Sequence, residues 1–538
     1  MSPIYHYAGP LKVFRQMTED KHQKSWQESF KEFIDPPVIT MLFLGFSAGI
    51  PILLIFSSLS LWLREAGVER SAVTFFSWAA LGYSFKFIWA PLVDSLPLPL
   101  LTKWLGRRRS WMITSQIMII LSISGMAIVD PAASQYGLSI MAIAAVMLGF
   151  SSATQDIVID AFRIESAECD LQAIMSSTYI AGYRIGMIVA GAGALFIASS
   201  LGSTKEAYSY DAWKWTYIIM ALTMLVGIAT TILRPEPASG AAQKEEHSVK
   251  DYTQFFMLFI FIVLSFIFGF IITANFASSA TEFLGVFLDN KHFASFLTGT
   301  VRLAIALGLA GFVAYIIARL GFVNKKMARS AYIAPVENFF CRYGASLAIL
   351  ILSLVGLYRI SDIVLGVISN VFYQDLGFTK IQIASVVKTF GLIMTIVGGF
   401  LGGILSIRFG VIKILFLGAL LSAATNLLFL LLASMGNNIT MLYLVISADN
   451  LSAGLASAAF VAFLSSLTDI SFTAVQYAIF TSLMTLLPKV LGGYSGTMVD
   501  SVGYPGFFTI TALMGVPVLF IVWIAGKKLN VGEKTFLK

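Results

Sequence analysis

The chain has 538 residues, of which 57% are hydrophobic and only 12% are charged, and its mean hydropathy is +0.83. This composition excludes a soluble globular protein, because so much apolar surface cannot be hidden from water, and it indicates a membrane protein with many spans. The net charge is +7. In a membrane protein, an excess of Lys and Arg reports the orientation of the chain in the membrane rather than nucleic-acid binding.

Residues 1–38 are polar and carry five Lys and Arg before the first apolar segment. A secretory signal peptide has its apolar segment close to the start, so we expect a cytosolic tail instead. Within the tail, LKVFRQM (residues 11–17) could lie on the membrane as a short helix or belong to a weakly ordered terminus.

The rest of the chain contains fourteen apolar segments long enough to cross a bilayer as helices, which needs about 20 residues each. They are 39–63, 73–95, 111–130, 138–162, 174–200, 213–233, 254–276, 294–319, 343–373, 382–407, 412–434, 440–467, 472–496 and 504–527. The predicted domains are a six-helix half (39–233), a cytosolic linker (234–253), two extra helices with a basic cytosolic loop (254–342), a second six-helix half (343–527) and a cytosolic tail (528–538).

Lys and Arg residues are distributed unevenly over the predicted loops. With the N-terminus in the cytosol, the cytosolic tails and loops hold 24 of the 36 Lys and Arg, and the external loops hold six. Because cytosolic loops of membrane proteins carry the excess of positive charge, this bias predicts that both termini are cytosolic.

Two halves of six helices resemble the plan of major facilitator transporters, whose substrate site lies between the halves near mid-membrane. The first half has APLVD (90–94) followed by GRRR (106–109), and the second has GGILSIRFG (402–410), two degenerate copies of a loop motif of that family. We expect a cytosolic gate formed by Asp94, Arg107, Arg108, Arg109 and Arg163.

Nine charged residues lie at least two positions from either end of the twelve core segments: Lys86, Asp156, Asp160, Arg184, Arg359, Asp362, Lys388, Asp449 and Lys489. Charges at membrane depth are costly and usually functional. The third, sixth, ninth and twelfth core segments, which form the outer support in the major facilitator fold, carry charge only at their ends. These nine charges therefore lie only on segments expected to line the cavity.

The stretch SSATQDIVIDAFRIE (151–165) places Asp156 and Asp160 on one helical face, four residues apart. Asp156 is interpreted either as a proton site that alternates with Lys86 or Arg184, or as half of a permanent salt bridge. Asp160 lies nearer the helix end, where it either organises the gate with Arg163 or takes part in proton binding. Asp362 is the next candidate for proton coupling.

Other polar residues suit a substrate. Tyr83 lies one turn from Lys86, and Tyr183 precedes Arg184, whose guanidinium can bind a carboxylate with two hydrogen bonds. Asn450 and Gln476 could meet sugar hydroxyls or amides, or hydrogen-bond between helices. We expect the glycines at 182, 186, 191 and 193 to be packing contacts.

The sequence resembles the AmpG-type muropeptide permeases. The resemblance is carried in order by YSFKFIWAPLVD, GRRRSW, SSATQDIVIDAFRIE, GYRIGMIVAGAGALF, VVKTFGLIMTIVGG, ADNLSAGLASAAFVAFL and FTAVQYAIFTSLM. It implies import of N-acetylglucosaminyl-1,6-anhydro-N-acetylmuramyl peptides from periplasm to cytosol by proton symport, in cell-wall recycling that feeds β-lactamase induction in some bacteria. It carries over Lys86, Gln155, Asp156, Asp160, Arg184, Lys388, Asn450 and Gln476, and such sugars would also suit Tyr83, Tyr183 and Tyr358.

The sequence departs from that family in three places. The extra helices are central, Asp449 stands where Glu is usual, and Lys489 follows Pro488 where an Arg in a smoother helix is expected. Substrate range therefore stays open, with acetyl-coenzyme A-like solutes, siderophores or drugs as the alternatives. A non-transporting sensor is another alternative.

A membrane-embedded enzyme is disfavoured, because no His and no nucleophile with a placed base falls within the membrane segments. We expect a monomeric carrier in the bacterial inner membrane, with lipid and a small molecule as partners, and no nucleic acid, metal or cofactor besides the coupling proton.

Overall fold

The computed structural model describes residues 32–55, 57–68, 83, 85–133, 135–167, 169–204, 207–237, 248–288, 291–379, 382–492 and 495–535. Within these ranges the protein is all-helical and has no strand. Twelve helical segments are long and apolar enough to span a membrane, and Ile470–Leu486 is a shorter apolar helix. The chain is thus a multi-pass membrane protein. Most of the predicted tail, and residues 73–82 and 84 of the predicted segment 73–95, lie outside the described residues.

In the described residues, the first half begins with a short 3₁₀ turn, Glu32–Ile34, and contains eleven further helices. They are α3 (Pro36–Ile55), α4 (Ser57–Glu65), η3 (Lys86–Ile88), α7 (Ala90–Ser95), α8 (Leu101–Leu105), α9 (Arg107–Ala127), α10 (Gln135–Ser166), α11 (Cys169–Ile188) continuing through the π-turn Val189–Gly193 into α12 (Ala194–Ser200), α13 (Tyr210–Thr223) and α14 (Leu225–Leu233).

The central insert contains α15 (Val249–Ile272), α16 (Ala274–Phe287) and α17 (Lys291–Arg319). The insert continues through α18 (Lys325–Ala328) and the π-turn η6 (Arg329–Ile333) into α19 (Ala334–Leu357), with which the second half begins. The second half goes on with α20 (Ile360–Asp375), η7 (Ile383–Phe390), α22 (Gly391–Phe409), α23 (Val411–Met435), α24 (Ile439–Leu467), η8 (Ile470–Phe472), α25 (Thr473–Gly492) and α26 (Ser495–Thr535).

Glycines let the helices within each half approach very closely. A Cβ at Gly49 of α3 would lie 2.0 Å from the carbonyl oxygen of Tyr183 on α11, and one at Gly182 would lie 2.0 Å from that of Leu42. A Cβ at Gly398 of α22 would similarly meet the Leu451 carbonyl of α24 at 2.1 Å. Membrane helices associate through such small residues, because lipid supplies no hydrophobic force between them. The packing role predicted for Gly182 is confirmed.

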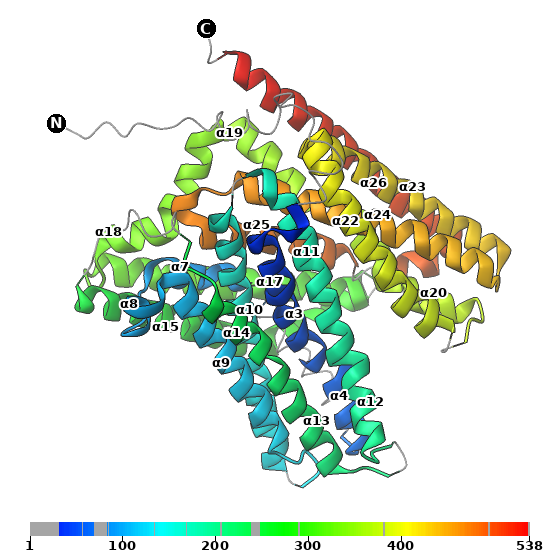
Figure 1. Cartoon of the computed structure of the whole chain (residues 1–538), viewed down its shortest axis with the longest axis horizontal. Helices are drawn as coiled ribbons and strands as arrows, with labels where there is room; N and C mark the ends of the chain where they lie inside the picture. Colours follow the sequence, from blue (N-terminus) through cyan, green and yellow to red (C-terminus); the bar gives the residue numbers. More distant parts are fainter. Residues whose placement is uncertain are drawn as a thin grey trace.

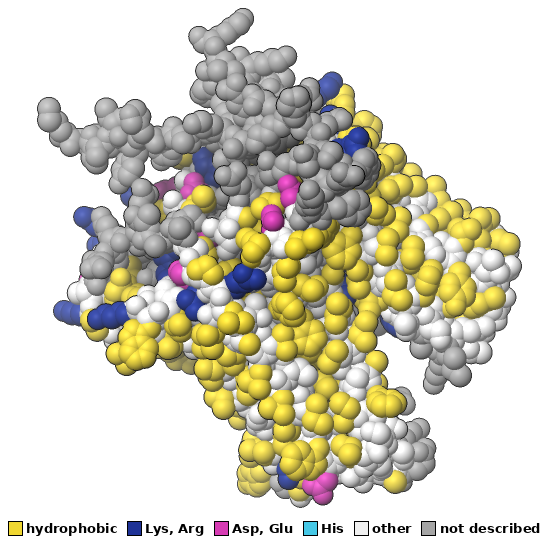
Figure 2. All heavy atoms as spheres, viewed as in Figure 1, with side chains coloured by type: hydrophobic (Ala, Val, Ile, Leu, Met, Phe, Trp, Pro, Cys, Tyr) yellow, Lys and Arg dark blue, Asp and Glu magenta, His cyan; other side chains and the backbone are white. Residues whose placement is uncertain are grey.

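The two halves meet at one end of the molecule and diverge at the other (Figure 1). The closed end is where α3, α9 and α25 begin and α10 finishes. The open end contains the tips of α4, α12 and α13 on one side and of α20 on the other. In the space-filling view a deep notch separates the two lobes at the open end (Figure 2). The molecule therefore has a cleft between its halves that opens at one end.

Two regions differ from the predicted elements. The insert holds an additional helix, α16, which packs beside α17. The basic stretch 319–342, expected to be a loop, is largely helical from Lys325 onward. Its single proline, Pro335, stands in the first turn of α19, where a proline costs no hydrogen bond. The helix breaks only at Gly344, where φ is +71°.

The insert belongs structurally to the first half. Phe255 and Leu258 of α15 and Met327 of α18 share one apolar core with Trp89 and Ala90 of the first half. The hydroxyl of Tyr332 also donates to the carbonyl of Ile88, at 3.3 Å. The insert therefore lies against the outer side of the first half, near α7 and α8 (Figure 1).

Candidate functional site

A buried charge cluster joins the halves at the closed end. Arg108 donates to Asp94 at 2.7 Å and to both oxygens of Glu165 at 2.6 and 3.0 Å. It also donates to the Thr473 hydroxyl of α25 at 2.8 Å, while the Val475 N–H donates to Asp94 at 3.0 Å. Arg108, Asp94 and Glu165 are each less than a tenth exposed. We call these four side chains, Asp94, Arg108, Glu165 and Thr473, the gate cluster.

Local structure at the start of α9 positions the Arg108 side chain. Gly106 precedes the helix with φ +85°, and a Cβ there would lie 2.5 Å from the Glu236 side chain. The Glu236 carboxylate accepts the backbone N–H groups of Arg108 and Arg109 at 2.7 and 3.0 Å. A carboxylate stabilises a helix N-terminus, because the first amides have no partners within the helix. Glu236 therefore ties the end of the first half to α9.

A second arginine also connects the halves at this end. Arg163 of α10 donates to Gln172 and Ser176 of α11, and to Ser465 of α24 at 2.8 Å. Its guanidinium also lies over the Tyr477 ring of α25, 5.2 Å from the centroid. Because Arg163 is fully buried, its contacts with α24 and α25 must break if the halves separate here.

A layer of charged side chains lies next to Arg163 in the first half. Lys86 is 3.7 Å from Asp160, and Asp160 is 3.5 Å from Arg163. Asp156 is half-buried and accepts a hydrogen bond from the Tyr179 hydroxyl at 3.4 Å, and it interacts electrostatically with Lys86. Lys86 therefore interacts with both carboxylates. It forms an ion pair with Asp160 and an electrostatic interaction with Asp156.

Aromatic and basic residues lie beside this layer in the first half. Tyr83 donates to Ser152, the rings of Tyr179 and Tyr183 are 6.1 Å apart, and Tyr183 and Arg184 are half-buried. Arg184 contacts the sulfur of Met187 at 3.9 Å and lies within electrostatic range of Arg359 in the second half. Each half thus contributes one arginine to this region.

The second half contributes its own polar group. Arg359 pairs with Asp362 at 3.3 Å and with Ser457 of α24, and the Ser422 hydroxyl donates to Asp362 at 2.7 Å. Asp449 is half-buried nearby and interacts electrostatically with Asp362. The Lys388 side chain is exposed. Asp362 thus has its partners, Arg359 and Ser422, within the second half.

Four of the predicted substrate-binding residues are engaged in helix packing. Gln155 is fully buried and donates to Ser47 of α3 at 3.0 Å. Tyr358 stacks on Phe460 and donates to the Leu415 carbonyl. Asn450 accepts from Thr395, and Gln476 accepts from the Asp469 N–H and donates to the Pro335 carbonyl. These bonds favour the helix–helix interpretation already considered for Asn450 and Gln476.

The predicted gating residues separate into two groups. Asp94, Arg108 and Arg163 reach the other half, as described. Arg107 donates to the Asp94 carbonyl at 3.1 Å, and Arg109 donates to the carbonyls of Thr231 and Ile232. These hydrogen bonds of Arg107 and Arg109 thus connect elements within the first half.

Several residues of the site were missed from the sequence. Glu165, Thr473, Ser465 and Tyr477 complete the closed end, and Tyr179 contacts Asp156. Tyr179 could have been found, because it lies four residues before Tyr183 on the same helix face. In the part of the chain that the structure describes, no group of three or more His, Cys, Asp or Glu could hold a metal ion.

Comparison with known proteins agrees with this architecture. The sequence model of the Major Facilitator Superfamily matches residues 39–358. The solved structure of the proton:xylose symporter XylE has the same fold, with a TM-score of 0.57 and 13% identity over 92% of this chain and 96% of that chain. The chain therefore belongs to the Major Facilitator Superfamily and is a transporter of small molecules.

Relatives with higher sequence identity narrow the family further. "Putative transporter AmpG 4" of Rickettsia felis is 30% identical over 93% of this chain and 99% of its own length. The "Anhydromuropeptide permease" of Escherichia coli K12 is 26% identical over 93% of this chain and 81% of its own length. Within the superfamily, this chain is a transporter of the AmpG type.

Proposed function

We propose that the protein imports anhydromuropeptides from the periplasm to the cytosol by proton symport, as one step of peptidoglycan recycling. The observation that carries the proposal is the charged layer: carboxylates (Asp156, Asp160) share one lysine (Lys86), and arginines of opposite halves (Arg184, Arg359) lie within electrostatic range of each other. The arginines would bind the peptide carboxylates of the substrate. Tyr83, Tyr183 and Lys388 would contact the sugars and the other polar groups of the substrate.

The Asp156 carboxylate is the proposed proton site. It has a hydroxyl partner, Tyr179, and shares Lys86 with Asp160, so a change in water access or in the position of Lys86 alters its preferred charge. Asp160 lies between Lys86 and Arg163 and would relay that change to the closed end. Asp362 is the corresponding candidate in the second half.

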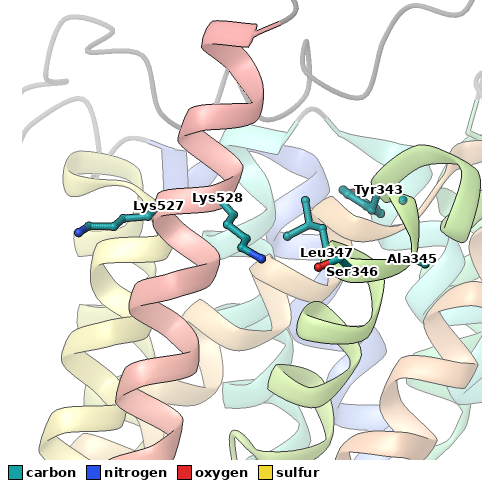
Figure 3. Close-up of a pocket in the computed structure, with 7 residues that line it drawn as sticks. Tyr343, Ala345, Ser346, Leu347, Lys527 and Lys528 are labelled. Atoms are coloured by element: carbon teal, nitrogen blue, oxygen red, sulfur yellow. The ribbon is translucent and has the colours of Figure 1, made fainter.

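The proposed orientation places the closed end in the cytosol of a bacterial inner-membrane protein. The closed end contains the basic turns around Arg108 and Arg163, and the last turns of α26 with Lys527 and Lys528. These lysines border a hollow of about 480 Å³ with residues 343–347, and Lys528 is directed toward Leu347 and Ser346 (Figure 3). Positive charge gathers on the cytosolic side of membrane proteins. The cleft would then face the periplasm.

Uptake of labelled anhydromuropeptide into proteoliposomes tests the proposal, with and without an inward proton gradient. Wild type should accumulate substrate only with the gradient. Asp156→Asn should still exchange substrate across the membrane but no longer respond to the gradient. If wild type ignores muropeptide and accumulates another anionic solute, the substrate is wrong; if Asp156→Asn still accumulates muropeptide with the gradient, the proton site lies elsewhere.

A further inference from the structure

A groove of about 630 Å³ lies on the outer side of the first half, where the insert packs against it. Five elements line it: η3 with Phe87 and Ile88, α15 with Leu258 and Ile262, α17, α18, and η6 with Tyr332 and Ile333. On α17 the lining residues are small, including Ala310, Gly311 and Ala314. The groove therefore has an apolar wall and an empty volume on a surface of the membrane domain.

One end of the groove is basic. Arg319 ends α17, and Lys325 begins α18, and both line the groove together with Arg329. Arg329 pairs with the exposed Glu337 at 3.1 Å. Among the described residues, no carboxylate lies within ion-pair distance of Arg319 or Lys325, whose side chains are exposed. Lys and Arg side chains gather at the left edge of Figure 2, around the position of α18 in Figure 1.

The dimensions of the groove match one leaflet of a bilayer. From Leu307 to Arg319, α17 rises by about 18 Å, at roughly 1.5 Å per residue. Half of the hydrocarbon core of a membrane is about 15 Å thick. The basic end belongs to the end of a predicted membrane span, Leu297–Arg319, where phospholipid head groups lie. The apolar part of the groove thus matches an acyl chain in length, and its positively charged end matches the position of an anionic phospholipid head group.

We propose that this groove binds one anionic phospholipid from the leaflet at the closed end. An acyl chain would lie along Ile262, Leu307 and Gly311, and the phosphate would meet Arg319 and Lys325. A free phosphate would gain nothing from the apolar wall, whereas a zwitterionic lipid would carry its own ammonium against the two cations. The lipid would connect the insert to the first half. The proposal does not depend on which substrate the cleft carries.

The glycines of α17 allow the groove to be filled selectively. A Cβ at Gly311, which lines the groove, would meet no atom within 4 Å, and neither would one at Gly308, which does not line it. A side chain added at Gly311 therefore starts in open space on the groove wall, so we expect Gly311→Leu to fill part of the groove, and Gly308→Leu is its matched control. For the charges, the double variant Arg319→Gln, Lys325→Gln is matched by Lys326→Gln, because Lys326 is exposed and lies outside the groove.

The experiment is native mass spectrometry of the purified full chain with equal amounts of phosphatidylglycerol and phosphatidylethanolamine that have the same acyl chains. Wild type, Gly308→Leu and Lys326→Gln should retain one phosphatidylglycerol in preference to phosphatidylethanolamine, by on the order of tenfold for two cations. The Arg319→Gln, Lys325→Gln variant should lose that preference, and Gly311→Leu should lose the bound lipid.

Several results would overturn the proposal. Equal retention of the two lipids by wild type would exclude recognition of negative charge. Equal loss of lipid in Gly308→Leu and Gly311→Leu would show that the groove is not the site. Protection against thermal unfolding by glycerol 1-phosphate equal to that by phosphatidylglycerol would indicate an anion site without a lipid. If Gly311→Leu does not fold, the charge variants still decide between these outcomes.

Discussion

At the scale of single residues, the closed end depends on two buried arginines. Arg108 and Arg163 are almost fully buried, and each bonds to groups of both halves. A buried charge is tolerated only where partners compensate for its lost hydration. Polar contacts of this kind can be replaced by water when the halves separate, whereas an apolar seal could not. The residues therefore suit a surface that must both close and open.

Replacing Arg108 by Gln should strongly destabilise the protein. The change would leave the buried Asp94 and Glu165 carboxylates without their cation, and breaking such a pair costs about 3–5 kcal/mol. We expect a clearly lower midpoint of thermal unfolding in detergent. Arg108→Lys should recover only part of the loss, because an ammonium cannot bond to Asp94, Glu165 and Thr473 in the same fork geometry.

Lys103→Gln is the matched control for Arg108. Lys103 belongs to the neighbouring helix α8 and is exposed, so its removal should change stability by no more than about 0.5 kcal/mol. A midpoint for Arg108→Gln equal to that of Lys103→Gln would show that the gate cluster contributes little to stability.

At the scale of elements, α11 and α22 form a close contact between the halves. A Cβ at Gly403 of α22 would lie 2.8 Å from the Ser177 hydroxyl and 3.3 Å from the Ala173 carbonyl, both on α11. Gly403 belongs to the degenerate loop-motif copy that ends the predicted segment 382–407. Its small size is therefore explained by the approach of the other half, and not by its own backbone, which is helical.

Gly403→Leu should push the halves apart at the closed end. Because the added side chain overlaps backbone and a buried hydroxyl of α11, α22 must move away from it. We expect electron-paramagnetic-resonance distances between labels at the native Cys341 and at Lys103→Cys to lengthen, in a background with Cys169→Ser. Cys341 and Lys103 are both exposed and belong to different halves.

Gly366→Leu provides the control for this substitution. Gly366 of α20 is exposed, and a Cβ there would meet no atom within 4 Å. It should leave the distance distribution of the double-labelled protein unchanged. Identical distributions for Gly403→Leu and Gly366→Leu would mean that the α11–α22 contact does not hold the closed end together.

At the scale of the whole molecule, the contacts are asymmetric along the membrane axis. The gate cluster and Arg163 join the halves at one end, while the lobes separate at the other (Figures 1 and 2). Alternating access requires such one-sided closure. The gate cluster would have to break, and the lobes at the open end would have to meet, for the cleft to face the opposite side.

The proposed orientation can be tested with the native Cys341. In a Cys169→Ser background, a membrane-impermeant maleimide should label Cys341 in inside-out vesicles but not in intact spheroplasts. Ser200→Cys should behave in the opposite way in a chain lacking both native cysteines, because Ser200 is exposed at the open-end tip of α12. Labelling of Cys341 in intact spheroplasts would reverse the assignment of the closed end to the cytosol.

The sequence by itself determined the class of fold and the segments that carry the polar site. Thirteen of the fourteen predicted segments correspond to apolar helices in the described part of the chain. The fourteenth, segment 73–95, is described only from Tyr83 onward, without residue 84. The count of fourteen therefore stays a prediction. These features can be predicted from the sequence because they depend on local properties. One is the hydropathy of a stretch of about 20 residues, and the other is the high cost of placing a charge inside such a stretch.

Which polar groups hold the helices together depends on the tertiary structure. Gln155 and Asn450 looked like substrate contacts, but Ser47 and Thr395 bind them from other helices. Glu165 belongs to the gate cluster because it accepts hydrogen bonds from Arg108. Arg108 also donates to Thr473, which is 365 residues away in the sequence. Partners so distant depend on helix rotation and on the docking of two halves, which periodicity within one segment does not specify.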